Sequence, residues 1–353
     1  MFKKKPAGPK AVQSDLREGV LLPFRAPKPD APAEPLPGEG AAPPAQPTGF
    51  KHIELEYPVH PRPRWLKYGR AGERLMAQLA TSVPAAKALI GQIARFHDQF
   101  MAIPAQAPLV EVTAETPPVN AGATTRTATI VVEACPGKTF VEANPAEPSW
   151  VNGWFPAFDA VMLYGLLALR NPRLYVEVGS GNSTRFARRA IRDHRLRTKI
   201  ISIDPCPRAE IDAICDQVVR APLEDVDTKE LERLTDEDLL FVDSSHRSFQ
   251  NSDVTVFFTE FLPALPPGIV YGMHDIYLPN DYPPEWAERF YSEQYLLAAY
   301  LHGGADGDEV LAPLAYLWHE TELVSAFAPT FDQLGLTHPQ RYGNSFWMRK
   351  AAR

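Results

Sequence analysis

The stretch that decides the fold is Leu174-Tyr-Val-Glu-Val-Gly-Ser-Gly-Asn-Ser-Thr184. Its first five residues form a short apolar run that ends at a glycine, which is typical of a buried strand. The two glycines allow a tight turn and let the backbone approach a ligand without a Cβ in the way. A helix is expected at residues 186–191, with Ser183 or Thr184 as its cap. A strand, a glycine turn and a helix in this order indicate a parallel α/β sheet.

Beyond this turn the chain alternates short apolar strands with helices, which predicts an α/β fold with a doubly wound, seven-stranded, mostly parallel sheet. The last two strands are expected to form a hairpin-like edge. A further helix is expected at residues 155–170, because Asn171-Pro172 would end it. The expected strands are residues 174–178, 199–203, 217–220, 239–242, 269–273, 310–317 and 344–349.

Two carboxylates lie close to the glycine turn in the predicted sheet. Glu177 lies at the carboxyl end of the first strand, where such sheets bind ligands, and it suits an ammonium group better than a diphosphate. Thr184 stands where a dinucleotide-binding motif has a third small residue. Asp204 ends the second strand, where an acid accepts hydrogen bonds from ribose hydroxyls. The pattern therefore favours S-adenosylmethionine (SAM) over NAD.

The same residues resemble a known family. Glu177-Val-Gly-Ser-Gly-Asn-Ser-Thr184 and Ile203-Asp204-Pro205 are similar to motifs I and II of the class I SAM-dependent methyltransferases. The resemblance runs from about Trp154 to the C-terminus and implies a Rossmann-like fold. It implies that Glu177 and the two glycines hold the methionine part of SAM, that Asp204 holds its ribose, and that Glu224 lies near adenine. The residues assigned to the cofactor are Glu177, Gly179, Gly181, Ser183, Asp204 and Glu224.

Acidic and histidine side chains end the fourth and fifth strands. Asp243 ends the fourth strand, and the dipeptide His274-Asp275 ends the fifth. The carboxyl ends of parallel strands open on one rim, and neighbouring strands lie about 4.8 Å apart, so Asp243 and Asp275 can converge on one ion. These carboxylates and a His274 nitrogen, with water and substrate oxygens, would suit Mg²⁺. Whether a metal is required is left open.

His246, three residues after Asp243, is the expected general base, because the ordinary pKa of imidazole lies near working pH. The arrangement resembles the metal-dependent O-methyltransferases, in which an acid ends strand four, a base follows three residues later and an acidic pair ends strand five. His274 departs from that pattern, which has a carboxylate or Asn there. The resemblance implies O-methylation of a small hydroxylated acceptor (a sugar, polyol or aromatic diol), with His246 and Asp243 catalytic. The aromatic stretch 277–286 is expected to line the acceptor site.

Three regions are predicted along the chain: a Pro- and Ala-rich tail at 1–49, a helical and hairpin extension at 50–153, and a SAM-dependent methyltransferase domain at 154–353. Few apolar side chains and many prolines predict an extended, mobile tail, interpreted as inert although a docking peptide is left open. In the extension, helical spacing is seen between residues 70 and 101, and a hairpin is expected to join 127–133 to a run through Phe140 and Val141.

Composition limits the class of protein. The net charge of −7 shows no dominant basic face, which argues against a nucleic-acid partner. Three cysteines are too few for a disulfide framework, so a cytoplasmic protein is expected. No stretch approaches the roughly 20 apolar residues of a membrane helix, so no membrane partner is expected. The expected partner is a small-molecule acceptor, and assembly into a homo-oligomer is left open.

Two other functions fit the same sheet. One is a metal-binding, hydroxylase-like or NAD-dependent enzyme, although Glu177 and Thr184 disfavour a dinucleotide. The other is a non-catalytic SAM-binding protein, although Asp243 and His246, whose loss would favour it, are both present. The cofactor that co-purifies with the protein would separate the NAD and SAM alternatives. The sequence does not identify the methyl acceptor.

Overall fold

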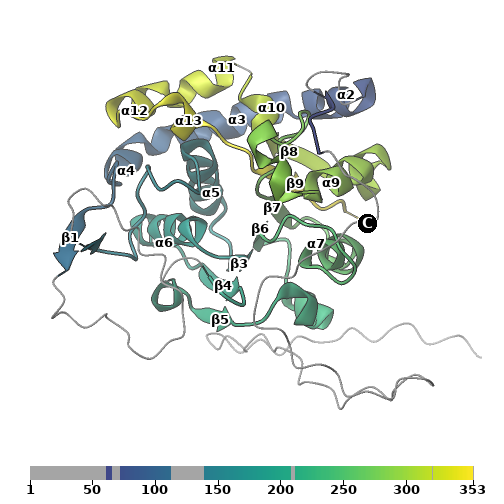
Figure 1. Cartoon of the computed structure of the whole chain (residues 1–353), viewed down its shortest axis with the longest axis horizontal. Helices are drawn as coiled ribbons and strands as arrows, with labels where there is room; N and C mark the ends of the chain where they lie inside the picture. Colours follow the sequence, from purple (N-terminus) through teal and green to yellow (C-terminus); the bar gives the residue numbers. More distant parts are fainter. Residues whose placement is uncertain (1–60, 66–71, 113–138, 208–210, 320, 353) are drawn as a thin grey trace, which may run out of the picture.

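The computed structural model describes residues 61–65, 72–112, 139–207, 211–319 and 321–352 (Figure 1). The expected tail at residues 1–49 lies outside these ranges, and so does the first run of the expected hairpin at 127–133. None of the helices in the described part of the chain has the length and apolar content needed to cross a bilayer.

The main sheet has seven strands: β3 (Leu174–Val178), β4 (Lys199–Ile203), β5 (Gln217–Val219), β6 (Leu239–Val242), β7 (Val270–Met273), β8 (Glu309–Pro313) and β9 (Phe346–Arg349). Their order is β5-β4-β3-β6-β7-β9-β8. β3 to β7 run parallel, and β9 is antiparallel to both of its neighbours. The predicted α/β fold with a seven-stranded, mostly parallel sheet is confirmed, including the hairpin-like pairing of the last two strands at the edge.

Helices cover both faces of this sheet (Figure 1). Side chains alternate between the faces, so Val176 of β3 packs in one apolar core and Tyr175 in the other. Because both cores are filled, the residues of β3, β6 and β7 are buried along the whole strand rather than at alternate positions. One core receives α2 (Glu73–Thr81), α7 (Asp253–Val256), α8 (Leu262–Ala264) and α9 (Glu293–His302). The other receives α3 (Val83–Ile93), α4 (His97–Met101), α5 (Ala157–Arg170), α6 (Asn182–His194), α10 (Leu314–Leu317), α11 (Thr321–Val324) and α12 (Ala328–Gln333).

Shorter elements connect these helices and strands. The 3₁₀ and π turns are η1 (Ala94–Phe96), η2 (Asp212–Ile214), η3 (Leu223–Asp225), η4 (Thr228–Arg233), η5 (Phe257–Phe261), η6 (Pro284–Arg289), η7 (Ala305–Gly307) and η8 (Ser325–Phe327). The short helix α13 (His338–Arg341) precedes the last strand.

Several predicted boundaries were wrong for identifiable reasons. The strand expected at 310–317 ends at Pro313, which has no N–H for the ladder, and α10 follows it. The strand expected at 344–349 begins at Phe346, because the N–H groups of Asn344 and Ser345 donate to the carboxylate of Asp159 in α5. The helix expected at 155–170 begins after Pro156 and ends, as predicted, at the left-handed Asn171.

The N-terminal helices share the two cores of the sheet. Leu75 and Leu79 of α2 lie in one core, and Ile93 of α3 lies in the other. Gly165 of α5 lies directly against Ile93, since a Cβ on Gly165 would lie 2.4 Å from Ile93 Cγ1. The helical pattern predicted between residues 70 and 101 is therefore confirmed, and these helices pack on the sheet.

A separate two-stranded sheet contains the second run of the expected hairpin, whose first run lies outside the described residues. β2 (Thr139–Glu142), which contains the expected run through Phe140 and Val141, pairs antiparallel with β1 (Leu109–Val112). The strand β1 was not predicted.

Candidate active site

The carboxyl ends of β3, β4, β6 and β7 lie along one rim of the sheet. The chain order reverses between β3 and β6, because β4 and β5 lie on one side of β3 and β6 and β7 on the other. Open α/β sheets bind ligands beside such a reversal. All the predicted site residues except Glu224 end or closely follow these four strands.

The glycine turn after β3 packs against the end of β6. Gly179 has a φ of +76°, and a Cβ there would lie 1.8 Å from the carbonyl oxygen of Asp243. Glycine is therefore required at 179 by the contact between two strand ends, in addition to any contact with a ligand. At Gly181 an added Cβ would meet nothing within 4 Å, so open space lies beside this part of the turn.

Helix α6 begins earlier than predicted. Its first residue is Asn182 and its N-cap is Gly181, so neither Ser183 nor Thr184 is the cap that the sequence suggested. Thr184 instead lies in the first turn, where its Oγ1 accepts a hydrogen bond from the Gly181 N–H at 3.0 Å and donates one to Glu177. The Thr184 hydroxyl, in the first turn of α6, thus accepts a hydrogen bond from the backbone N–H of the N-cap residue, which has no partner within the helix.

Glu177 is fully buried beneath the glycine turn. Its carboxylate accepts hydrogen bonds from the Tyr175 hydroxyl, at 2.7 Å, and from Thr184. Burial raises the pKa of Glu177 to about 7, although the hydroxyls of Thr184, Ser183 and Tyr175 act against the increase. Glu177 was predicted to face an ammonium group. Its carboxylate is instead hydrogen-bonded to the hydroxyls of Tyr175 and Thr184, and it is only partly ionised near neutral pH.

Asp204 and Glu224 are the other two carboxylates that the sequence assigned to the cofactor. The Asp204 carboxylate accepts from the backbone N–H groups of Ser180 and Cys206, each at 2.7 Å, and so ties the glycine turn to the end of β4. Glu224 lies in η3, where burial raises the pKa of its carboxyl. Its Oε2 atom is buried with no hydrogen-bond partner among the described residues. This oxygen is an acceptor that a ligand donor could satisfy.

Asp243 and Asp275 converge, as predicted, at the ends of β6 and β7. Ligand atoms of Asp243, His246 and Asp275 all lie within 4.8 Å of one another. The Nε2 atom of His246 lies 3.3 Å from Asp243 Oδ1 and 3.4 Å from Asp275 Oδ2. His246, predicted as a base, thus lies beside both carboxylates through its Nε2 atom.

His274, predicted as a metal ligand, lies beside this cluster. Its Nδ1 is 3.3 Å from Asp243 Oδ1 and 3.7 Å from Asp275 Oδ1. Its Nε2 points the other way, 3.4 Å from Asp159 Oδ2. The structure therefore brings all four predicted residues to one place. Both histidines lie beside Asp243 and Asp275, and they differ in the partner of the second ring nitrogen.

Two buried carboxylates that hold these histidines were not predicted as site residues. Glu293, the first residue of α9, accepts at 2.8 Å from His246 Nδ1, and Asp159 of α5 faces His274. They are 47 and 115 residues away from their histidines, so no local spacing connects them. Asn344 also belongs to the site, since its Nδ2 donates to Asp275 Oδ1 at 2.9 Å.

The charges of the cluster are strongly coupled. Burial opposes ionisation of Asp243, but His274 and His246 hold its pKa well below its usual range. Burial alone would lower the pKa of His246, but hydrogen bonds to Asp243 and Glu293 raise that pKa well above its ordinary value. Burial likewise would lower the pKa of His274, and Asp243 and Asp275 raise it. In the protein alone, protonated imidazoles therefore offset the carboxylates.

A cavity of about 100 Å³ opens on this cluster. The ring of Tyr291 is 4.7 Å from that of His246, and Trp286, from the predicted acceptor-lining stretch, forms another part of the wall. Trp154 at the mouth is 59% exposed. The residues that line the cavity are Gly153, Trp154, Asp243, His246, His274, Asp275, Trp286, Arg289 and Tyr291.

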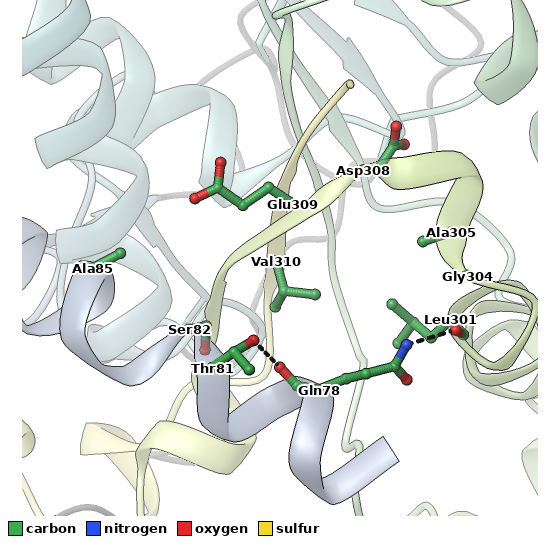
Figure 2. Close-up of a pocket in the computed structure, with 10 residues that line it drawn as sticks. All are labelled: Gln78, Thr81, Ser82, Ala85, Leu301, Gly304, Ala305, Asp308, Glu309 and Val310. Carbon is green, nitrogen blue, oxygen red and sulfur yellow. Dashed lines mark hydrogen bonds between the residues drawn. The ribbon is translucent and has the colours of Figure 1, made fainter. Parts of the chain in front are cut away.

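A larger cavity of about 350 Å³ lies elsewhere, between helices α2 and α3 and the region around β8 and α9. Figure 2 shows its lining, in which the amide of Gln78 donates to the carbonyl of Leu301. None of the predicted site residues lines this cavity. The chemically reactive side chains are therefore gathered at the smaller one.

The rim matches a known class of domain. Residues 176–276 match a family model described as a methyltransferase domain. The matched residues run from β3 through β7 and include the glycine turn, Asp204, Asp243 and His274-Asp275. The chain matches no curated protein.

Similar solved structures share little sequence with this chain. The SAM-bound O-methyltransferase TomG from Streptomyces achromogenes, involved in tomaymycin synthesis, is 16% identical over 56% of this chain and 81% of that chain, with a TM-score of 0.32. The SAH-bound methyltransferase PaMTH1 from Podospora anserina is 14% identical over 55% and 79%, with a TM-score of 0.34. A CmcI structure with Mg and SAM is 16% identical over 54% and 69%, with a TM-score of 0.30. At these scores, the function must be argued from the residues of this chain.

Proposed function

We propose that the protein is a SAM-dependent methyltransferase that methylates a hydroxyl group of a small acceptor. One observation carries the proposal: the glycine turn at Gly179 lies directly against Asp243. The predicted cofactor turn and the cluster of carboxylates and histidines are thus immediate neighbours, as transfer between a cofactor and an acceptor requires. The methyltransferase-domain match over residues 176–276 supports the same assignment.

The residues beside the turn fit SAM. Open space lies at Gly181, where the methionine part would approach the backbone. Asp204 lies at the end of β4 for the ribose, and Glu224 has an unsatisfied buried oxygen for a donor such as the adenine amine. Glu177 would act on the methionine ammonium through its charge and through the first turn of α6. When bound, SAM supplies an activated methyl group.

The carboxylates of Asp243 and Asp275 fit a hard divalent cation such as Mg²⁺, which prefers oxygen ligands. Protonated His246 and His274 offset the carboxylates in the protein alone, so positive charge suits this position. Two buried oxygens near this cluster have no hydrogen-bond partner among the described residues: Ser244 Oγ and Asn344 Oδ1. Ser244 follows Asp243 in the sequence, and the amide of Asn344 donates to Asp275. When bound, a divalent cation would orient the acceptor oxygen and lower its pKa.

His246 is protonated in the protein alone, so it would take the proton of the acceptor once a bound cation has replaced its positive charge and left the imidazole neutral. Glu293 accepts from Nδ1, which fixes the ring and leaves Nε2 at the cavity. A carboxylate behind an imidazole holds the ring in one tautomer and stabilises the imidazolium that forms, as in other His–carboxylate pairs. We therefore infer that Glu293 positions His246 and that His246 Nε2 is the base.

Removal of the Asp204 carboxylate is expected to weaken SAM binding. Asp204→Ala leaves ribose hydroxyls without a charged acceptor and frees the Ser180 N–H, at a cost of about 1.5–3 kcal/mol. Isothermal titration with SAM and with NAD measures this loss, and the exposed neighbour of Glu224 supplies the control variant Asp225→Ala. Binding of NAD without binding of SAM would contradict the proposed function.

SAM affinity is expected to increase with pH up to about 7. The pKa of Glu177 is raised from 4.5 to about 7, so its contribution to folding stability is fully present below about pH 4.5 and is lost as pH rises through 7. A cationic ligand favours the ionised carboxylate, so affinity should increase up to about tenfold per pH unit between pH 5 and 7 and level off above it. Calorimetry in two buffers of different ionisation enthalpy measures the number of protons that Glu177 releases when SAM binds. In Glu177→Gln the pH dependence in this range should disappear, and a wild-type affinity that is flat with pH would exclude a role for Glu177.

A further inference from the structure

The cavity at the rim is lined by side chains of opposite charge. Asp243 and Asp275 contribute carboxylates, and Arg289 contributes a guanidinium group. Arg289 is the last residue of η6, which begins within the predicted acceptor-lining stretch 277–286 and precedes α9. The sequence alone gave no reason to separate Arg289 from the other residues of that region.

Arg289 is held in place by aromatic rings. Its guanidinium lies 4.0 Å from the ring centroid of Trp286 and 5.7 Å from that of Tyr291. Trp286 is itself fixed by edge contacts with Tyr277 and Tyr291, at 5.3 and 5.7 Å between centroids. Stacking against rings satisfies the face of a guanidinium but leaves the N–H donors along its edges available.

Those donors have no acidic partner in the described part of the chain. No carboxylate there lies within ion-pair distance of Arg289, although many other described arginines are paired, such as Arg188 with Asp216. The nearby Arg247 donates to the carbonyl groups of Arg289 and Ser245. Arg289 therefore lines the cavity, and none of the described carboxylates compensates its charge.

We propose that the acceptor is a hydroxylated aromatic acid, whose carboxylate pairs with Arg289 while its hydroxyl lies at Asp243 and Asp275. This assignment rests on the proposed function and narrows its acceptor class. The carboxylate supplies the missing counter-ion in the bidentate geometry that a guanidinium favours. The aromatic side chains of Trp154 and Tyr291, which also line the cavity, suit a planar ring, and Trp154 is exposed, which leaves room for substituents on that ring. A neutral sugar or polyol would leave Arg289 unpaired.

Matched pairs of acids and esters test the assignment. The probes are 2,3-dihydroxybenzoate, 3,4-dihydroxybenzoate and 3,4-dihydroxycinnamate, each compared with its methyl ester. Binding is measured by calorimetry on the full chain with SAH and Mg²⁺ present, which requires no turnover. For at least one pair the wild-type protein should bind the acid about 10- to 100-fold more tightly than the ester, because a charge-assisted hydrogen bond is lost in the ester.

Arg289→Gln should reduce that preference to within about twofold, and Arg289→Lys, which keeps the charge but not the paired donors, should give an intermediate value. Arg74→Gln, at an exposed arginine of α2, is the matched control and should keep the wild-type preference. If methyl transfer is detected, Arg289→Gln should raise KM for the acid and leave kcat within a few fold. Unchanged SAH binding and melting temperature verify that each variant is folded.

Equal binding of acid and ester by the wild-type protein in all three pairs would overturn the assignment, and so would a preference that survives in Arg289→Gln. Tighter binding of glucuronate than of every aromatic acid would show that the acceptor is an acid but not an aromatic one. Failure of the proposed function is a separate result, because it is seen as absence of SAM and SAH binding in the wild-type protein.

Discussion

Replacement of His246 by alanine is expected to lower the rate of methyl transfer about 10²–10⁴-fold, the usual contribution of a positioned base. The change removes the nitrogen that faces the cavity, 3.3 Å from Asp243 Oδ1. SAM binding should be unchanged, since the cofactor contacts proposed above lie at the ends of β3 and β4 and in η3. Mg²⁺ affinity should fall by no more than a few fold, because the two carboxylates remain. The measurements are single-turnover rates with the aromatic acids above and calorimetry with SAM and Mg²⁺.

A second variant at the same cluster distinguishes loss of the base from loss of the metal ion. Asp243→Asn should lose Mg²⁺ affinity and activity together, while SAM binding survives. Chelation of the wild-type protein should likewise abolish turnover, and added Mg²⁺ should restore it. The matched control is His302→Ala, at an exposed histidine at the end of α9, which should behave as the wild type.

Two outcomes would change the assignment. If His246→Ala loses Mg²⁺ affinity as completely as Asp243→Asn does, then Nε2 is a metal ligand rather than a base, which its 3.4 Å approach to Asp275 also permits. Full activity in excess chelator would exclude the metal and leave His246 as a metal-free base. A rate within tenfold of wild type in His246→Ala, with the metal bound, would exclude the base.

The fold was predictable because its signals are local. The run before Gly179 identifies β3, and the apolar runs that end at Asp204, Asp243 and His274 identify its neighbours, so the sheet and its reactive rim follow from short segments. Strand ends were less predictable where a distant group captures a backbone amide. The early residues of the last strand, Asn344 and Ser345, donate to Asp159, and nothing near them in the sequence indicates this.

The orientation of the two histidines was not predictable. Spacing placed His246 and His274 at the rim, but the partner of each ring decides which nitrogen faces the cavity. Glu293 fixes His246 from α9, and Asp159 fixes His274 from α5. Both carboxylates lie in helical segments that also bury apolar side chains, so their sequence pattern is that of ordinary core helices. The role of Arg289 was hidden for a similar reason, because it depends on the stacking of Trp286.

Substitution of Gly179 by alanine is expected to be the most damaging single change for stability. The residue has a φ of +76°, which costs an L-residue about 1–2 kcal/mol, and the new Cβ would lie 1.8 Å from the Asp243 carbonyl oxygen. The shift needed to relieve such overlap adds about 1–3 kcal/mol. Because Val178 and Asp243 are also joined by a backbone hydrogen bond, that shift would move the cluster as well as the turn. Denaturant unfolding should therefore show a lower midpoint with an unchanged m-value, together with weaker SAM binding.

Gly181→Ala provides the matched comparison two residues away. Its added Cβ meets nothing within 4 Å, and the residue has an extended φ of 175°, so stability should fall by less than about 1 kcal/mol, the scale of an N-cap change. SAM affinity should nevertheless fall, because the methyl group would occupy the open space proposed for the methionine part. The pair thus separates a glycine required by packing from a glycine required by a ligand. Wild-type stability in Gly179→Ala would show that the turn does not pack on Asp243, and unchanged SAM affinity in Gly181→Ala would place the cofactor elsewhere on the rim.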